Sequence, residues 1–188
     1  GSTGPTGRQL ADIRAGTIGP NGEGTKIDPP APLKDFTLPS SNGGKLSLHD
    51  LRGKYVLLFF GYTHCPDLCP TTLAQFRQIK QQLGSKAKDV SFVFVSVDPD
   101  RDTPAVLRKY VRSFDPSFIG LSGDPKVLDA IKSDYGLYYQ LNKDEGTNYT
   151  VNHSSNIYLI DAEGRLTMVY SYGTNTEVII HDLENMLS

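Results

Sequence analysis

The alternation of apolar and polar positions divides most of the chain into strands and helices. Two continuous apolar runs, Tyr55–Phe60 and Ser91–Val97, predict strands that are covered on both faces, as in a parallel sheet. Between them, apolar residues recur at helical spacing and stop at Gly84: Leu73, Phe76, Ile79 and Leu83. A strand, a helix and a second strand in this order predict a right-handed βαβ unit.

In the second half of the chain, shorter segments show either the helical or the strand period of apolar residues. The predicted elements are a helix carrying Val106, Leu107, Tyr110 and Val111, a strand Ser117–Leu121, a helix Pro125–Tyr135, strands Asn156–Ile160 and Leu166–Tyr170, and a helix Asn175–Leu187. The turn at Asp161–Gly164 predicts that the last two strands are antiparallel. The polar segment Asn142–Thr147 is expected to be a mobile β-excursion.

The amino-terminal part of the chain contains less regular structure in this prediction. Residues 1–32 mix Gly, Pro, Thr and Asn without a period, so we expect a flexible or surface-draped arm there. Period-two alternation in Phe36–Leu38 and Lys45–Leu48, around Ser40–Gly44, predicts a hairpin. The whole order is that of an α/β, thioredoxin-like fold with an added amino-terminal hairpin and an inserted loop before the penultimate strand. Residues 33–188 are expected to form this one domain.

Composition and charge exclude several classes of protein. The chain has 188 residues and 38% apolar content, which fits one domain that buries about 70% of its unfolded surface. Its net charge is −2 and no basic block occurs, so binding to nucleic acid or to an anionic membrane surface is not expected. No apolar run reaches the ~20 residues that span a bilayer. The start at Gly1-Ser2, without Met, is expected to be a remnant of tag cleavage on a truncated chain.

The segment Gly61–Pro70 contains the two cysteines of the chain and is the candidate working site. It joins a buried strand to a helical pattern, and helical spacing would place Cys65 and Cys69 on one face of the helix. The start of a helix is expected to lower thiol pKa values. A disulfide between these positions would close a very short loop and add little stability. A redox or ligand role therefore explains the pair better than a structural bridge or two small core residues.

Asp98 and the histidines are weaker candidates for residues of the working site. Asp98 follows the second buried strand and is expected beside the cysteine loop, although capping of the next helix explains it equally well. His153 is the candidate third metal donor, although a lone histidine is more often a surface residue. His64 could stabilise Cys65 as a thiolate, but an exposed loop histidine is the simpler interpretation. The two remaining histidines are expected at the surface: His49 and His181.

Three motifs resemble the Sco family, the copper-binding assembly factors of cytochrome c oxidase. They are Gly61–Pro70 (GYTHCPDLCP), Val95–Thr103 (VSVDPDRDT), and Tyr149–Ser154 (YTVNHS) before Ile157–Ile160. They occur in the order and spacing of the family and cover roughly residues 32–187. Together they are highly specific, whereas any one of them would be weak.

The resemblance implies a copper-binding site and the residues that form it. Cys65, Cys69 and His153 would be the ligands of one copper ion, as Cu(I) or Cu(II), and Asp98 a neighbour that tunes the site. Two thiolates and an imidazole suit Cu(I) in particular. The chain departs from the family at Asn152, where mitochondrial relatives usually have Asp; this puts in doubt a role for that position, but not the ligand beside it.

The resemblance also implies partners and a location. The acceptor of the copper would be the binuclear copper A centre of cytochrome c oxidase subunit II, with an upstream copper donor protein and a thiol reductant as further partners. The chain would face the bacterial periplasm at the inner membrane, or the mitochondrial intermembrane space, and would be held by an amino-terminal membrane anchor that is missing here.

Two other functions remain open at the level of the sequence. The cysteine pair could serve a thiol-disulfide oxidoreductase that reduces the cysteines of the same acceptor, or a peroxiredoxin-like peroxidase on the same fold. A copper-responsive binding module that delivers no metal is a third interpretation. Replacing His153 by Ala and measuring copper retention and reduction potential separately would distinguish a metal carrier from a reductase.

Overall fold

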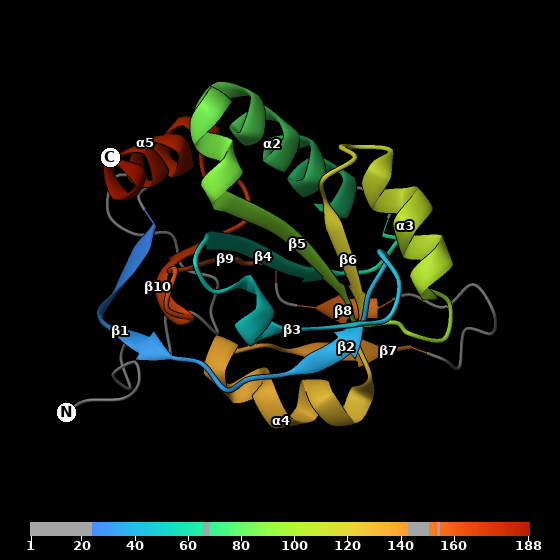
Figure 1. The fold of residues 1–188 in the computed structure, drawn as a ribbon. Coiled ribbons are helices and arrows are strands. Elements are labelled where there is room, and N and C mark those ends of the chain that lie inside the picture. Colours follow the sequence, from blue (N-terminus) through green and yellow to red (C-terminus); the bar gives the residue numbers. More distant parts are fainter. Residues whose placement is uncertain (1–23, 66–67, 143–150, 154) are drawn as a thin grey trace.

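The computed structural model describes residues 24–65, 68–142 and 155–188, and the backbone of 151–153 (Figure 1). Its centre is a six-stranded sheet in the order β1-β10-β9-β4-β5-β6. The strands of this sheet are β1 (Thr25–Pro32), β4 (Tyr55–Gly61), β5 (Val90–Ser96), β6 (Ile119–Ser122), β9 (Ile157–Ile160) and β10 (Arg165–Tyr170).

Strands β4, β5 and β6 are parallel, and their apolar residues form the centre of the core. Phe59 of β4 lies opposite Phe94 of β5, and both side chains are fully buried or nearly so. Helix α2 (Leu68–Leu83) connects β4 to β5, and helix α3 (Pro104–Arg112) lies between β5 and β6. The four apolar residues that predicted α2 are all buried. The sequence prediction of a βαβ unit with buried strands is confirmed.

Strands β9 and β10 complete the sheet with antiparallel pairing, as the tight turn between them predicted. Strand β9 pairs with β4, and Phe59 lies opposite Ile157. Antiparallel pairing places the start of β9 beside the carboxyl end of β4. The segment before β9 and the cysteine loop after β4 therefore leave the sheet at the same edge.

Helices cover both faces of the sheet (Figure 1). Helices α2 and α5 (Thr176–Leu187) pack against each other on one face, while α4 (Pro125–Tyr135) covers the opposite face. Asn175 caps α5 and Asp124 caps α4, each through its side chain. The layers and the strand order confirm the α/β, thioredoxin-like prediction.

Two short antiparallel pairs lie outside the large sheet. The predicted hairpin is present as β2 (Thr37–Pro39) and β3 (Lys45–Ser47), followed by a 3-10 helix, Leu48–Leu51; a second 3-10 helix, Gly84–Asp89, follows α2. The hairpin docks on β6, because the Ser41 N–H donates to the Gly120 carbonyl over 2.8 Å. Strands β7 (Tyr139–Leu141) and β8 (Val151–His153) flank the predicted β-excursion, most of which lies outside the described residues.

The predicted amino-terminal arm requires a correction. Thr25–Pro32 forms strand β1, which pairs antiparallel with β10 and buries Ile27 and Ala31. Residues 1–23, the rest of the predicted arm, lie outside the described residues. Within the described part of the chain, no helix has the length and apolar character needed to cross a membrane.

Candidate functional site

Cys65 and Cys69 lie together where β4 passes into α2. Cys65 is in the loop after β4, where its N–H donates to the Tyr62 carbonyl over 3.2 Å, and Cys69 is in the first turn of α2. They are not joined by a disulfide, and their side chains are hydrogen-bonded to each other. The prediction started the helix at Pro66, directly after Cys65; helix α2 is described from Leu68 on, and residues 66 and 67 lie outside the described residues. The loop nevertheless brings the two sulfurs together.

Gly61 makes room for the sulfur of Cys69 at the end of β4. A β-carbon at this position would lie 2.6 Å from Cys69 Sγ and 2.9 Å from the ring of Phe94. Both distances are far below van der Waals contact. The backbone here is fixed as well, because the Gly61 carbonyl accepts from the Val97 N–H over 2.8 Å. Any side chain at residue 61 would displace the sulfur or the ring.

The environment of Cys69 favours the neutral thiol, contrary to the sequence expectation. Its burial raises the pKa of the Cys69 thiol above the ordinary value, and the hydrogen bond with Cys65 and the charge of Asp102 raise it further. A backbone hydrogen bond at Tyr62 acts in the opposite direction but is weaker. Removal from water opposes the thiolate more strongly than the start of a helix favours it. A thiolate at Cys69 therefore needs a cation or a further hydrogen-bond donor.

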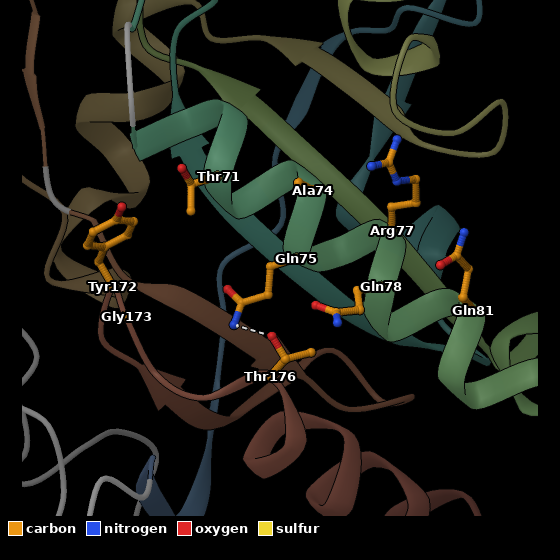
Figure 2. A pocket seen from close by; sticks show the side chains of 9 residues that line it. All are labelled: Thr71, Ala74, Gln75, Arg77, Gln78, Gln81, Tyr172, Gly173 and Thr176. Atoms are coloured by element: carbon orange, nitrogen blue, oxygen red, sulfur yellow. Dashed lines mark hydrogen bonds between the residues drawn. The ribbon is translucent and has the colours of Figure 1, made fainter.

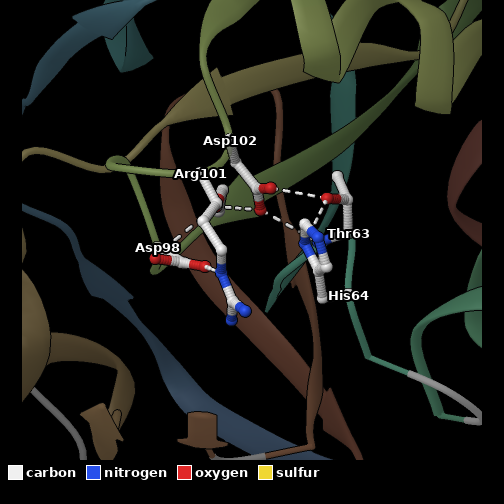
Figure 3. Close-up of polar contacts among 6 residues, drawn as sticks. Thr63, His64, Asp98, Arg101 and Asp102 are labelled. Atoms are coloured by element: carbon white, nitrogen blue, oxygen red, sulfur yellow. Dashed lines mark hydrogen bonds and ion pairs between the residues drawn. The ribbon is translucent and has the colours of Figure 1, made fainter. Parts of the chain in front are cut away.

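Asp102, rather than the predicted Asp98, is the carboxylate that contacts the cysteine loop (Figure 3). Asp102 is fully buried and accepts hydrogen bonds from the Thr63 N–H over 2.9 Å and from the Thr63 hydroxyl over 2.5 Å. It also accepts from the Ser96 hydroxyl over 2.7 Å. Asp102 thus ties the loop to the end of β5. No pattern in the sequence distinguished Asp102 from the neighbouring turn residues.

Asp98 forms an ion pair with Arg101, which contacts the loop. It is fully buried, and its Oδ2 lies 2.5 Å from Arg101 Nε. The guanidinium of Arg101 lies 5.8 Å from the centroid of the Tyr62 ring, a cation–π contact. The Asp98–Arg101 pair therefore supports the chain three residues before Cys65.

His153 is the last residue of β8, which pairs with β7. Its Cα lies opposite that of Tyr139 in the β7–β8 pair, and its side chain is not among the described parts of the chain. His153 precedes Ile157 by four residues, and Cys65 follows Phe59 by six. Since Phe59 and Ile157 are partners in the β4–β9 pair, the segment that carries His153 and the segment that carries Cys65 both leave the sheet beside these two residues.

The other three histidines are exposed, as the sequence predicted. His64 Nδ1 lies 3.4 Å from the Thr63 hydroxyl (Figure 3), His49 pairs with Asp35, and His181 lies near Asn185. Among the described side chains, no three His, Cys, Asp or Glu residues form a group that could hold a metal ion. A third ligand for Cys65 and Cys69 would thus have to come from elsewhere in the chain or from a partner.

Two cavities flank helix α2 and the cysteine loop. One, of about 430 Å³, is lined by Thr63, His64 and four residues of α3 and its end: Val106, Lys109, Tyr110 and Ser113. The other, of about 560 Å³, lies between α2 and the segment before α5, and Arg77 is its one charged lining residue (Figure 2). Neither cysteine lines either cavity, but the first is lined by Thr63 and His64, the two residues before Cys65.

Comparison with known sequences identifies related proteins over most of the chain. Residues 25–188 match the family model described as SCO1/SenC. The mitochondrial protein SCO2 homolog of Bos taurus is 39% identical over 148 residues, which cover 77% of this chain and 56% of that protein. The chain spans about half to two thirds of the length of such curated relatives.

Solved structures share the fold. The structure of Bradyrhizobium japonicum ScoI with copper bound is 39% identical, has a TM-score of 0.75, and covers 82% of this chain and 99% of that one. The structure of BsSco is 27% identical, has a TM-score of 0.67, and covers 85% of this chain and 95% of that one. That structure identified a disulfide switch in BsSco, which is a member of the Sco family of cytochrome c oxidase assembly proteins.

Proposed function

The chain belongs to the SCO1/SenC family, and from this membership we propose that it carries one copper ion on Cys65, Cys69 and His153 for cytochrome c oxidase assembly. The observation that carries the proposal is the pair of reduced cysteine side chains that interact with each other at the start of α2. Relatives of the same fold hold copper in their solved structures, which supports copper as the cargo.

The chemistry of the donor set fits this cargo. Thiolates are soft ligands that select Cu(I), and two thiolates with one imidazole satisfy its preference for few ligands. Binding must release the thiol protons, because the thiolate is the form that binds metal. The raised pKa of Cys69 means that a cation supplies the stabilisation that the buried thiolate lacks. The site would thus hold its second sulfur as a thiolate mainly while metal is bound.

His153 is proposed as the ligand that leaves first. The cysteines lie on the core side of the site, whereas the backbone of His153 belongs to the short β7–β8 pair outside the large sheet. An acceptor with cysteine and histidine ligands could replace the imidazole and then the two sulfurs. We propose the copper A centre of cytochrome c oxidase subunit II as this acceptor. An upstream copper donor and a thiol reductant would act before it, at the bacterial inner membrane on its periplasmic side or in the mitochondrial intermembrane space.

A second candidate function uses the same sulfurs without metal. Oxidation of Cys65 and Cys69 would remove two electrons and two protons and form one disulfide, and the reverse reaction could reduce a disulfide of the acceptor. The contact between the two thiols favours this thiol-disulfide oxidoreductase as the alternative. A peroxiredoxin-like peroxidase is a further use of the pair, and peroxide consumption by the reduced chain would reveal it.

Replacement of His153 separates the two functions. We expect His153→Ala to lower Cu(I) affinity at least tenfold in a competition with a chromogenic chelator, while the reduction potential of the cysteine pair stays unchanged. His64→Ala is the matched control, since His64 is exposed and directly precedes Cys65; it should retain copper. Wild-type affinity in His153→Ala would refute the three-ligand carrier and leave the oxidoreductase.

A further inference from the structure

The cavity of about 430 Å³ lies between the cysteine loop and helix α3. Thr63 and His64 form its loop side, and the residues of its helix side are Val106, Lys109, Tyr110 and Ser113. These four positions are spaced i, i+3, i+4 and i+7, so they share one face of the helix. His64 directly precedes Cys65 in the chain. A side chain that filled this cavity would therefore lie one residue away from Cys65.

Both sides of the cavity are fixed by contacts within the chain. On the loop side, the Asp102 carboxylate accepts from the Thr63 N–H over 2.9 Å (Figure 3). On the helix side, the ring of Tyr110 contacts Phe94 at 5.7 Å and Phe114 at 5.6 Å. A cavity with fixed walls costs little ordering when it is filled. The cavity is thus formed before any partner arrives.

Val106 gives the rim of this cavity an apolar side chain. It is one of three large apolar residues that the described part of the chain leaves exposed, with 40% of its area accessible. An apolar side chain that entered the cavity would remove Val106 from water and gain the free energy of that burial. Interfaces between proteins are commonly anchored by one large side chain in such a cavity. The cavity therefore suits a large apolar anchor.

The exposed surface of α3 carries positive charge. Arg108, Lys109 and Arg112 are exposed, and no acidic residue occurs in Pro104–Arg112. Among the described ion pairs, none includes any of these three cations. The nearest carboxylates along the chain on either side of the helix, Asp102 and Asp115, are engaged with Thr63 and Lys80. The surface beside the cavity is therefore basic, although the whole chain has a net charge of −2.

We propose that the cavity and the basic surface of α3 form a docking site for an acidic segment of a partner protein. The partner inserts a large apolar side chain into the cavity and places carboxylates against Arg108, Lys109 and Arg112. Charge complementarity selects this occupant, because a basic segment would be repelled and an uncharged one would gain nothing from the cations. The inference rests on the proposed function only in that exchange at Cys65 gives the docking its purpose.

The experiment is an NMR titration of the whole chain, without copper, with three short peptides. The first peptide has one Phe flanked by Glu, the second has Lys in place of Glu, and the third has Gly in place of Phe. Lys109→Glu reverses one charge of the proposed site. Lys86→Glu is the matched control, because Lys86 is exposed in the 3-10 helix before β5, at the end of that strand opposite to the cysteine loop. Thermal melts verify that both variants are folded.

We expect the Glu-Phe peptide to shift the amide signals of Thr63, His64 and Val106–Ser113. At low ionic strength its Kd should be about tenfold lower than that of the Lys peptide, and about tenfold lower than that of the Gly peptide. Lys109→Glu should weaken binding of the Glu-Phe peptide about tenfold and reduce its dependence on salt. Lys86→Glu should change the Kd by less than about twofold, because it lies far from the site.

Equal affinity for the acidic and basic peptides would overturn the inference, and so would equal weakening by the two charge reversals. Equal affinity for the Phe and Gly peptides would overturn it as well, because the cavity would then hold no anchor. Sedimentation of the wild type as a dimer that Lys109→Glu abolishes would assign the surface to a second copy instead. The titration contains no copper, so failure of the wild type to bind Cu(I) would refute the proposed function without altering these affinities.

Discussion

At the scale of single residues, the space around the Cys69 sulfur depends on a residue that has no side chain. Gly61 ends β4, and its place can hold no β-carbon while Cys69 Sγ and the Phe94 ring stay where they are. The two sulfurs can lie together at the start of α2 because the last residue of β4 has no side chain to occupy this space. Replacement of this glycine thus tests the packing of the site directly.

Gly61→Ala should destabilise the chain by about 1–3 kcal/mol, as overpacking of a core does, and should change the exchange rate of the cysteine pair. Urea unfolding and reaction with glutathione disulfide measure the two effects. Gly120→Ala is the control, because its β-carbon would lie 3.0 Å from Leu107 Cβ but no sulfur is among its nearest atoms. If Gly61→Ala folded and reacted like the wild type, the assigned crowding would be incorrect.

The residues of the site differ in how well the sequence could predict them. Cys65 and Cys69 were evident because thiols are rare and their position between strand and helix is distinctive. Asp102 was not, since its role depends on the end of β5 meeting the cysteine loop, and aspartate in a turn is ordinary. The prediction for Asp98 placed a carboxylate near the loop, but the direct contact belongs to the residue four positions later.

At the scale of elements, β1 is the strand that the sequence did not predict. Thr25–Pro32 contains three prolines and a weak alternation, which resembles a linker more than a strand. Proline is tolerated there because β1 is an edge strand, where missing N–H groups can face away from the sheet. The central strands were predictable for the opposite reason: burial on both faces demands continuous apolar runs.

Ile27→Ala should lower the free energy of unfolding by about 2–4 kcal/mol, because Ile27 is fully buried where β1 covers β10. Chemical denaturation followed by circular dichroism measures the change. Lys45→Ala, at an exposed position of β3, should stay within about 0.5 kcal/mol of the wild type. Similar stability of Ile27→Ala and wild type would show that β1 contributes little to the folded state.

His49 connects the 3-10 helix after the hairpin to the segment before it and should make stability pH-dependent. Its hydrogen bond to Asp35, with Nδ1 and Oδ2 2.5 Å apart, raises the pKa of His49, and the charge of Asp35 raises it further. The stabilisation is therefore complete below the unfolded pKa of about 6.5 and disappears as the pH rises through the higher folded value.

The test compares the wild type with Asp35→Asn. The difference in melting temperature between them should be larger at about pH 5.5 than at about pH 8.5, and NMR titration should show a lower pKa of His49 in the variant. Because the pair is exposed, the effect on stability is expected to be small. A difference in melting temperature that does not vary with pH would contradict this assignment.

At the scale of the whole molecule, metal should stabilise the reduced chain through linkage. If Cu(I) binds only the folded state, a free concentration 100 times Kd adds about 2.7 kcal/mol, or roughly 5–10 °C in melting temperature for a chain of this size. Differential scanning calorimetry with a Cu(I) buffer measures it. The Cys65→Ser and Cys69→Ser double variant should show no shift; an equal shift there would place the copper elsewhere.

The unequal exposure of the two sulfurs fixes the sequence of events at the surface. Cys65 retains 8% of its accessible area and Cys69 retains none. In the exchange proposed for this pair, an incoming protein would reach only the outer sulfur at first, so the reaction would begin with a bond to Cys65 alone. Cys69 would then attack that bond and release the partner. A chain in which Cys69 were the more exposed sulfur would be expected to bind partners through Cys69 first.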